Sequence, residues 1–235
     1  DKDLQLLAEY IYTKVFLGYT LKQWDCTPEQ LDPSVTGSVP VYISRDDRYF
    51  QEKYQAIPRL GYTKMFENML AHPRIEVKLG TDFLNIKQEV AWERLIYTGP
   101  IEEFFCYKYG KLPYRSLKIK IETVDTDKFQ NAPVVNYPEN YDFTRSTEYK
   151  YFLNEKSDKT TLSFEYPENF EEGKNDRIYP ILNEANQAIY NRYTADAQKM
   201  PNTYFIGRLG AYRYYDMSRT IANAFETFNI IKNKK

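Results

Sequence analysis

TYFIGRLGAYRYYDM, residues 203–217, predicts a strand, a glycine turn and the start of a helix. Residues 204–206 form an apolar, strand-like run that leads into Gly207, and apolar residues recur at helical spacing after Asp216. A helix N-terminus presents free N–H groups and can bind an anion. The approach to this one carries an arginine and three tyrosines. Two interpretations stay open: a ligand site, or a capped helix whose Asp216 only accepts N–H bonds.

The composition excludes several classes of function. At 235 residues the chain can bury one sizeable core, or a core shared between two interleaved lobes. Its net charge of -1 does not favour nucleic acid or an anionic membrane, and no apolar run is long enough for a membrane span. No signal peptide opens the chain, and Cys26 and Cys106 are far apart, which predicts reduced thiols and a cytoplasmic location.

Catalysis by familiar side-chain nucleophiles or by zinc is also excluded. The one histidine, His72, precedes Pro73 in a predicted surface turn, so the parts of a Ser-His-Asp, Cys-His or zinc site are missing. The chain has 23 tyrosines, and they permit two readings. Such rings suit a pocket that stacks a base or sugar, but tyrosine also favours β-strands.

Periodicity predicts a mixed α/β (α+β) fold. A helix is expected over residues 1–18 and closed by Gly18, then a second short helical piece and a loop over 26–48. An antiparallel sheet is expected between residues 117 and 164. The remaining predicted elements are helices at 61–70 and 183–199, strands at 75–79 and 94–99, and sheet strands at 118–123, 132–137, 147–152 and 160–166.

Many short stretches, taken together and in order, resemble bacterial UDP-galactopyranose mutases over essentially the whole chain. These stretches are YTLKQW at 19–24, DRYF at 47–50, YQAIP at 54–58, GYT at 61–63, YTGPI at 97–101, YRSL at 114–117, NY at 136–137, TR at 144–145 with Glu148, EYP at 165–167, YP at 179–180, GRL at 207–209 and YYDM at 214–217.

The resemblance implies a flavin-dependent isomerase, an intramolecular transferase that interconverts UDP-galactopyranose and UDP-galactofuranose. In that family N5 of reduced FAD, not a side chain, attacks the anomeric carbon, displaces UDP and forms a covalent flavin–sugar adduct. The absence of a protein nucleophile fits this chemistry. The resemblance also implies a cytoplasmic enzyme, allows a homodimer, and includes neither nucleic acid nor a membrane span.

The resemblance further predicts how the chain divides. A partial FAD-binding lobe is interleaved with a helical segment and an antiparallel sheet domain. The expected parts are a helical substrate-side domain (1–36), a mobile loop and connection (37–60), part of the FAD-binding lobe (61–100), the sheet domain (101–182) and a return to the FAD-binding lobe (183–235).

Each candidate site residue follows from its match to the family's motifs. By resemblance, Arg145 contacts the diphosphate, for which a guanidinium fork is well suited. Substrate-binding residues implied are Tyr19, Thr20, Trp24, Tyr49, Asn136, Arg145, Tyr179 and Tyr214. Catalytic residues implied are Arg208, Tyr214 and Asp216; cofactor-binding residues implied are Arg208, Leu209, Asp216 and Met217; no metal is implied.

Simpler interpretations stay open beside these assignments. Arg145 could form a surface pair with Glu148, and Trp24 could pack a helix end. Arg115 is expected to serve the fold or the flavin side.

Two departures from the family pattern matter. The glycine-rich dinucleotide fingerprint is absent from these residues, which indicates a truncated chain, with a flavin-free relative as the alternative. Ser38 stands where the family has a loop arginine, so Ser38→Arg is expected to strengthen UDP-galactose binding in a full-length protein.

The expected function is therefore the mutase reaction, with FAD as cofactor and UDP-galactose and UDP-galactofuranose as ligands. The isolated chain is expected to be inactive and to expose apolar surface where strands are missing. The alternative is a non-catalytic UDP-sugar-binding fragment. A tyrosine-rich carbohydrate domain or an amine-oxidase-like flavoenzyme would not need the UDP-side motifs.

Overall fold

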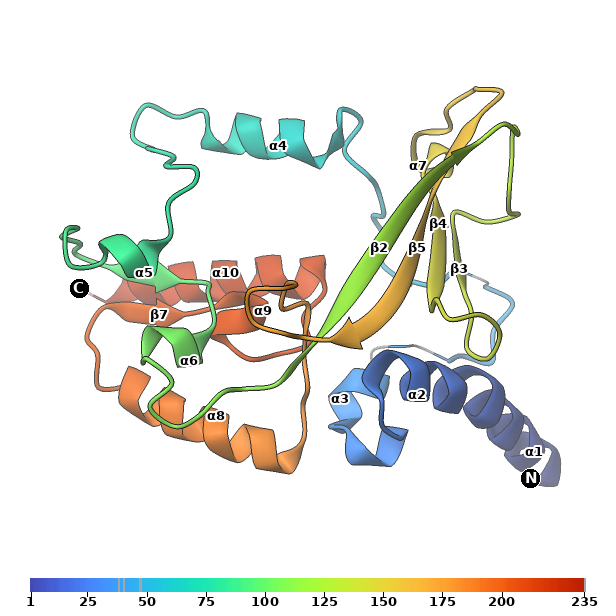
Figure 1. Ribbon diagram of the computed structural model, residues 1–235, viewed down its shortest axis with the longest axis horizontal. Helices are drawn as coiled ribbons and strands as arrows, with labels where there is room; N and C mark the ends of the chain where they lie inside the picture. Colours follow the sequence, from blue (N-terminus) through green and yellow to red (C-terminus); the bar gives the residue numbers. More distant parts are fainter. Residues whose placement is uncertain (38, 40, 47, 235) are drawn as a thin grey trace.

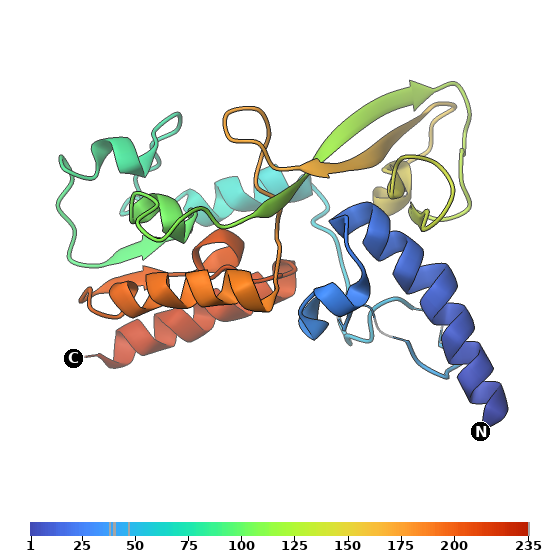
Figure 2. The same cartoon turned by 60° about the horizontal axis from the view of Figure 1, so that its bottom comes forward.

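Figure 1 shows the computed structural model of the protein, which describes residues 1–37, 39, 41–46 and 48–234. An α/β body fills one side of the molecule, and a long, twisted β-ribbon with its flanking strands fills the other. The N-terminal helix lies beside the end of this sheet, as the rotated view in Figure 2 also shows.

The N-terminal segment forms one continuous helical rod. It consists of α1 (Lys2–Ile11), a π-helical turn (Tyr12–Leu17) and α2 (Gly18–Trp24). The prediction that Gly18 closes a helix is wrong, because the chain there has helical angles, with φ -62° and ψ -43°. The rod ends at Asp25, whose φ of 58° is left-handed.

The stretch expected to be a loop, residues 26–48, contains two short helices. They are a 3-10 turn (Pro28–Gln30) and α3 (Pro33–Thr36). A proline stands at the start of each, where its missing N–H costs no hydrogen bond. Asp32 caps α3 by accepting from the backbone N–H of Ser34 at 2.9 Å.

The antiparallel sheet is confirmed. Within the described residues it has the order β3-β4-β5-β2-β6 and antiparallel pairing throughout. Its strands are β2 (Tyr114–Val124), β3 (Val134–Asn136), β4 (Arg145–Glu148), β5 (Thr160–Asn169) and β6 (Tyr179–Pro180). The strand predicted at 147–152 is only partly right, because β4 ends at Glu148 and α7 (Lys150–Leu153) follows.

The α/β body is built on a parallel pair of strands. β1 (Leu95–Tyr97) pairs with β7 (Thr203–Phe205), although more than a hundred residues separate them in the chain. The helices of this body are α5 (Phe83–Ile86), α6 (Ile101–Phe104), α8 (Glu184–Ala197), α9 (Gly207–Gly210) and α10 (Met217–Asn233). The predicted strand–turn–helix at 203–217 is confirmed, with α10 capped by Asp216.

The segment between the two bodies departs from one prediction. The helix expected at 61–70 is confirmed as α4 (Gly61–Leu70), which stands apart at the top of Figure 1. The strand expected at 75–79 is wrong, because these described residues belong to no strand. Alternation of apolar and polar residues makes a strand only when a neighbouring strand pairs with it.

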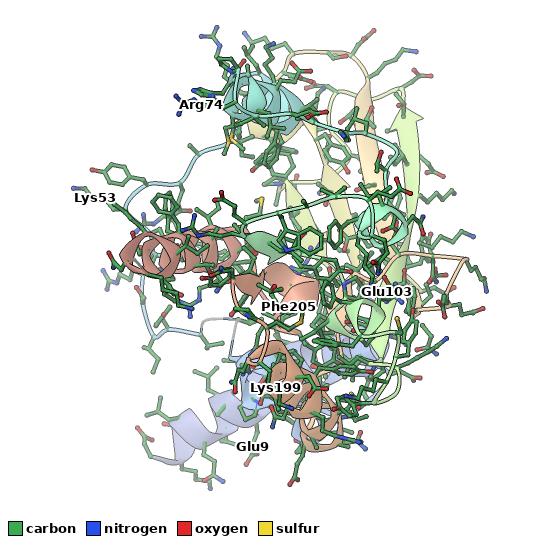
Figure 3. All side chains as sticks on the ribbon, turned by 90° about the vertical axis from the view of Figure 1, so that its left-hand side faces the viewer. Glu9, Lys53, Arg74, Glu103, Lys199 and Phe205 are labelled. Atoms are coloured by element: carbon green, nitrogen blue, oxygen red, sulfur yellow. The ribbon has the colours of Figure 1, made fainter. Side chains whose placement is uncertain are left out.

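The main core lies where the bodies meet. Its buried members come from α2, α3, α6, β2, α8 and the turns next to these elements: Trp24, Leu31, Val35, Ile101, Leu112, Tyr114, Leu182, Tyr193 and Tyr212. A smaller cluster consists of Leu95 and Tyr97 from β1 and Phe104 from α6. Phe205 packs against both clusters and lies near the centre of Figure 3, whereas Lys53 and Arg74 lie at the periphery.

Several helices leave apolar faces exposed. None of the ten residues of α1 is buried, and Leu4 and Leu7 are 48% and 47% exposed. Along α10 the exposed apolar residues are Met217, Ile221, Phe225, Phe228 and Ile230. Among the described residues, no helix combines the length and apolar character needed to cross a membrane.

Candidate functional site

A cluster of aromatic side chains marks the junction of the two bodies. Tyr19 comes from α2, Tyr179 from β6 and Tyr214 from the turn before α10. The rings of Tyr179 and Tyr214 lie 5.7 Å apart, and each is 5.7 Å from Trp24. Trp24 is only 6% exposed, so in this conformation its indole supports the tyrosines from beneath. Segments distant in sequence thus build one aromatic wall.

Arg145 lies against this wall and is held from several sides. Its Nη2 is 3.5 Å from the hydroxyl of Tyr19, and its Nε donates to Oδ1 of Asn136 at 3.1 Å. Its Nη1 is 3.7 Å from Oε2 of Glu165. The side chain stays one-third exposed, which leaves the cation accessible to a ligand.

The alternative pairing of Arg145 with Glu148 is not what the structure shows. Glu148 is fully buried and accepts from Thr160 Oγ1 at 2.7 Å and from the backbone N–H of Gln130 at 2.9 Å. Residues three apart on a strand point to opposite faces of the sheet, so these two side chains cannot meet on β4. Glu165 faces Arg145 instead, because the two residues are directly opposite in the β4–β5 register.

Burial sets the protonation of the cluster. It is the largest cause that raises the pKa values of Tyr19, Tyr179 and Tyr214 above the ordinary range for tyrosine. These hydroxyls therefore stay protonated and can donate hydrogen bonds at neutral pH. Burial also raises the pKa of Glu165, and the charge of Arg145 opposes that rise.

Arg208 is locked in place beside the same rings. Its Nε donates to the carbonyl of Tyr215 at 3.0 Å, and its Nη1 donates to the carbonyl of Ile178 at 2.9 Å. The guanidinium carbon lies 5.2 Å from the ring centre of Tyr179 and 5.6 Å from that of Tyr214. Arg208 thus contributes a fixed positive charge and also orients the turn that carries Tyr214.

The other predicted site residues are spread more widely. Thr20 is buried, whereas Tyr49 is 52% exposed and packs on Phe50 with ring centres 4.8 Å apart. Asp216 caps α10 by accepting from Arg219 N–H at 2.7 Å, as the simpler interpretation expected. Leu209 is half-buried, Met217 is 65% exposed and Ser38 lies outside the described residues.

Arg115 serves the fold. It is 5% exposed, and its Nε donates to the carbonyl of Gln23 at 2.9 Å. The same guanidinium bonds Asn169 through Nη1. It thereby ties the end of α2 to β2 and β5, beneath the aromatic wall.

The carboxyl ends of β1 and β7 form a second edge of the site. Gly99 follows β1 and Gly207 follows β7, so both lie where open α/β sheets bind ligands. A Cβ on Gly99 would lie 2.6 Å from the hydroxyl of Tyr97, and one on Gly210 would lie 2.8 Å from the Tyr97 carbonyl. A side chain at position 210 would meet backbone and one at position 99 would press on the Tyr97 ring, and Gly207 has a left-handed φ of 76°.

Two features of the site escaped prediction from sequence. Glu165 lies in a quoted stretch, but its partnership with Arg145 depends on strand register. The edge at Gly99 likewise depends on the pairing of β1 with β7. For the edge at Gly99, the sequence signal was a glycine at the end of a predicted strand.

The described residues also form cavities away from Arg145. An apolar groove of about 560 Å³ lies along α1 and is lined by residues such as Leu7, Ile11 and Phe16. No three His, Cys, Asp or Glu side chains in the described part of the chain are grouped so that they could hold a metal ion. The arrangement around Arg145 suits an anion, since a forked and partly exposed cation lies beside the hydroxyl of Tyr19.

Comparisons with known proteins point to one family. The family described as UDP-galactopyranose mutase (GLF) matches residues 14–214. A probable UDP-galactopyranose mutase of Klebsiella pneumoniae is 37% identical over 97% of this chain and 59% of its own length. A UDP-galactopyranose mutase of Mycoplasma pneumoniae is 34% identical over 94% of this chain and 59% of its own length.

A relative of different specificity and a solved structure are also similar. The dTDP-fucopyranose mutase of Escherichia coli is 34% identical over 100% of this chain and 64% of its own length. A crystal structure of reduced UDP-galactopyranose mutase matches with a TM-score of 0.64 at 16% identity, over 87% of this chain and 61% of its own. The chain thus spans about 60% of the length of the curated relatives it matches.

Proposed function

Because the chain belongs to the UDP-galactopyranose mutase family, we propose that it carries the sugar-nucleotide site of an enzyme that interconverts UDP-galactopyranose and UDP-galactofuranose. The observation that carries this proposal is the convergence of Arg145, Tyr19, Tyr179 and Tyr214. These residues come from separate segments, and together they suit a diphosphate ligand.

The reaction requires that UDP leave the anomeric carbon and later return. Arg145 holds the diphosphate, and its charge stabilises the negative charge that grows as the sugar bond breaks. The protonated hydroxyls of Tyr19, Tyr179 and Tyr214 donate to phosphate or sugar oxygens, while their rings exclude water. Glu165 and Asn136 keep the guanidinium oriented.

The residues also fit one side of a flavin. The carboxyl ends of β1 and β7 are shaped by glycines, and Arg208 supplies a cation beside the tyrosines. Arg208, Leu209, Asp216 and Met217 would hold FAD there, and reduced FAD when bound supplies the nucleophile. The solved relative described as reduced supports a redox cofactor. These residues include no glycine-rich turn for its pyrophosphate.

Two alternatives remain distinct from this proposal. The described residues alone could bind the nucleotide sugar without catalysis, as the missing fingerprint suggests. The substrate could also be a dTDP-linked deoxysugar, because the dTDP-fucopyranose mutase is 34% identical to this chain, close to the 37% and 34% of the two UDP-galactopyranose mutases above. Cytoplasmic location and a homodimer stay predictions.

The binding test is calorimetric titration of the chain with UDP, dTDP and inorganic phosphate. Tighter binding of UDP than of dTDP supports the UDP-galactose assignment, and the reverse order supports the alternative substrate. Absence of nucleotide diphosphate binding contradicts the proposal. Arg192→Ala is a suitable control, since Arg192 stacks on Tyr109 at α8 and is not part of the site.

The cofactor test is the visible absorption spectrum of the purified chain before and after addition of FAD. Flavin absorbance retained through gel filtration supports cofactor binding by these residues. A colourless chain that still binds UDP supports the non-catalytic alternative. Interconversion of the two UDP-sugars is then measured on the complete gene product with reduced flavin.

A further inference from the structure

The N-terminal helix touches one loop of the sheet with a single face. Lys14, Gly18 and Lys22 are four residues apart along this helix, and each lies against the same loop. The loop they meet covers residues 137–144 and joins β3 to β4. Lys14 forms an exposed ion pair with Glu139 at 3.0 Å.

Gly18 sets how closely the helix and the loop approach. A Cβ at this position would lie 2.9 Å from the carbonyl oxygen of Pro138, closer than real contacts allow. The glycine therefore lets the backbone of the loop rest on the helix. It also explains why a glycine stands inside the rod, where it does not end the helix.

Lys22 makes the most specific contacts of this face. Its Nζ donates to the backbone carbonyls of Tyr137 at 2.6 Å, Asn140 at 3.0 Å and Phe143 at 3.3 Å. An ammonium group has three N–H donors, and here each is used by the loop. The side chain is half-buried and unites both ends of the loop with its middle.

The loop matters because of what flanks it. Asn136 precedes it and Arg145 follows it, and the two are opposite each other in the β3–β4 register. On the helix, Lys22 stands between Tyr19 and Trp24. Lys22 therefore joins α2, which carries Tyr19, to the β3–β4 hairpin, which carries Arg145.

We propose that Lys22 is a positioning residue of the diphosphate site. It fixes the 137–144 loop to α2, so that Arg145 and Asn136 from the sheet meet Tyr19 from the helix at a set distance. This inference rests on the proposed function, since the ligand it serves is the diphosphate. Lys22 does not touch that ligand and acts through Arg145.

Contacts other than those of Lys22 also hold the 137–144 loop, so the loop is expected to stay folded when Lys22 is replaced. Phe143 stacks on Tyr141 with ring centres 5.0 Å apart and packs against Phe164 at 4.9 Å. The N–H of Tyr137 also donates to the carbonyl of Thr144 at 2.8 Å. Loss of Lys22 is therefore expected to shift the loop rather than unfold it.

The test compares UDP with uridine, which has no phosphate, on the full chain by calorimetry. Lys22→Met keeps the length of the side chain and removes its charge and donors. It is expected to weaken UDP binding about tenfold, because small misplacements of a binding group are costly, and to leave uridine binding unchanged. Lys22→Arg, which keeps the charge, is expected to recover part of the UDP affinity.

Controls separate the inference from general charge effects. Lys14→Met removes a positive charge from the same helix face and is expected to leave UDP binding unchanged. In an Arg145→Ala background, Lys22→Met should have no further effect on UDP binding. An equal loss for UDP and uridine, an unchanged UDP affinity, or full additivity with Arg145→Ala each overturns the inference.

A second measurement decides the matter without a ligand. Amide hydrogen exchange is followed at residues 137–144 in the unmodified chain, Lys22→Met and Lys14→Met. Faster exchange in Lys22→Met alone is expected, and unchanged exchange overturns the inference. If the unmodified chain binds no UDP, the proposed function fails, and exchange still tests whether Lys22 holds the loop.

Discussion

At the scale of single residues, Arg145 carries the proposed ligand contact. Its guanidinium is held by Asn136, Tyr19 and Glu165 and remains partly exposed. Arg145→Ala is expected to weaken UDP binding by about 1.5–3 kcal/mol, the usual value of a hydrogen bond to a charged group. Calorimetry checks this, with Arg192→Ala as the matched control; equal affinities for the two variants would contradict the assignment.

Glu102 is a second residue with a measurable consequence. It is 1% exposed; burial, the largest cause, raises its pKa from 4.5 to about 7, despite nearby Arg177 and a hydrogen bond from Tyr114. In the folded chain the carboxyl therefore prefers its protonated form. The raised pKa means that its stabilising contribution is complete below pH 4.5 and is lost as the pH rises through about 7.

Between those limits the contribution of Glu102 to the free energy of unfolding is expected to fall by about 3 kcal/mol. Glu102→Gln is expected to remove this decline and to be more stable than the unmodified chain at pH 8. Urea denaturation at pH 5 and pH 8 measures both effects. Exposed Glu155→Gln is the control, and an undiminished pH dependence in Glu102→Gln would show that another group is responsible.

At the scale of elements, the N-terminal rod illustrates how a neighbour overrides local preference. Replacing a helical glycine by alanine ordinarily stabilises a helix by about 1 kcal/mol. Gly18→Ala is expected instead to destabilise the chain by about 1–3 kcal/mol, because the new Cβ meets Pro138. Thermal unfolding measures this change, with exposed Thr13→Ala as the control. A gain in stability for Gly18→Ala would contradict the prediction and mean that the 137–144 loop moves aside at little cost.

The start of α10 separates a structural role from a ligand role. Asp216→Ala removes the N-cap and is expected to cost about 0.5–2 kcal/mol of stability, whereas Asp216→Asn keeps a good cap. If Asp216 also acts on the sugar or flavin, Asp216→Asn lowers turnover of the complete enzyme while its unfolding temperature stays unchanged. Normal turnover in Asp216→Asn would show that Asp216 serves only as the N-cap of α10.

At the scale of the whole molecule, the most prominent surface feature is the set of exposed apolar side chains on α10. On α10, Phe225 is 66% exposed and Phe228 is 57% exposed, and Thr227 is the buried residue of this described helix. Stripes of this kind are rare on isolated soluble chains and mark contact surfaces. The isolated chain is therefore expected to self-associate as its concentration rises.

Light scattering coupled to gel filtration measures this association. Phe225→Glu is expected to reduce it, because a charge is placed in the apolar stripe, whereas Glu226→Lys on the same helix is expected to leave it unchanged. A monomer over the whole concentration range would contradict the expectation. Equal reduction by both variants would point to net charge rather than to the apolar stripe.

Features that depend on near neighbours in the chain could be predicted from the amino-acid sequence. Alternation predicted the antiparallel strands, helical spacing predicted α4, α8 and α10, and the run into Gly207 followed by Asp216 predicted a turn and a capped helix. These features depend on neighbours a few residues away. The motifs that resemble the mutase family were likewise legible in order along the chain, and the family was confirmed.

Contacts between distant segments follow from the folded structure and could not be predicted from local patterns. Strand register gave Arg145 its partner Glu165 and left Glu148 to a buried network. The approach of a loop kept Gly18 inside a helix, and the lack of a pairing neighbour left residues 75–79 outside any strand. Such contacts join residues far apart in the chain, so their free energy depends on the whole fold and not on any local pattern.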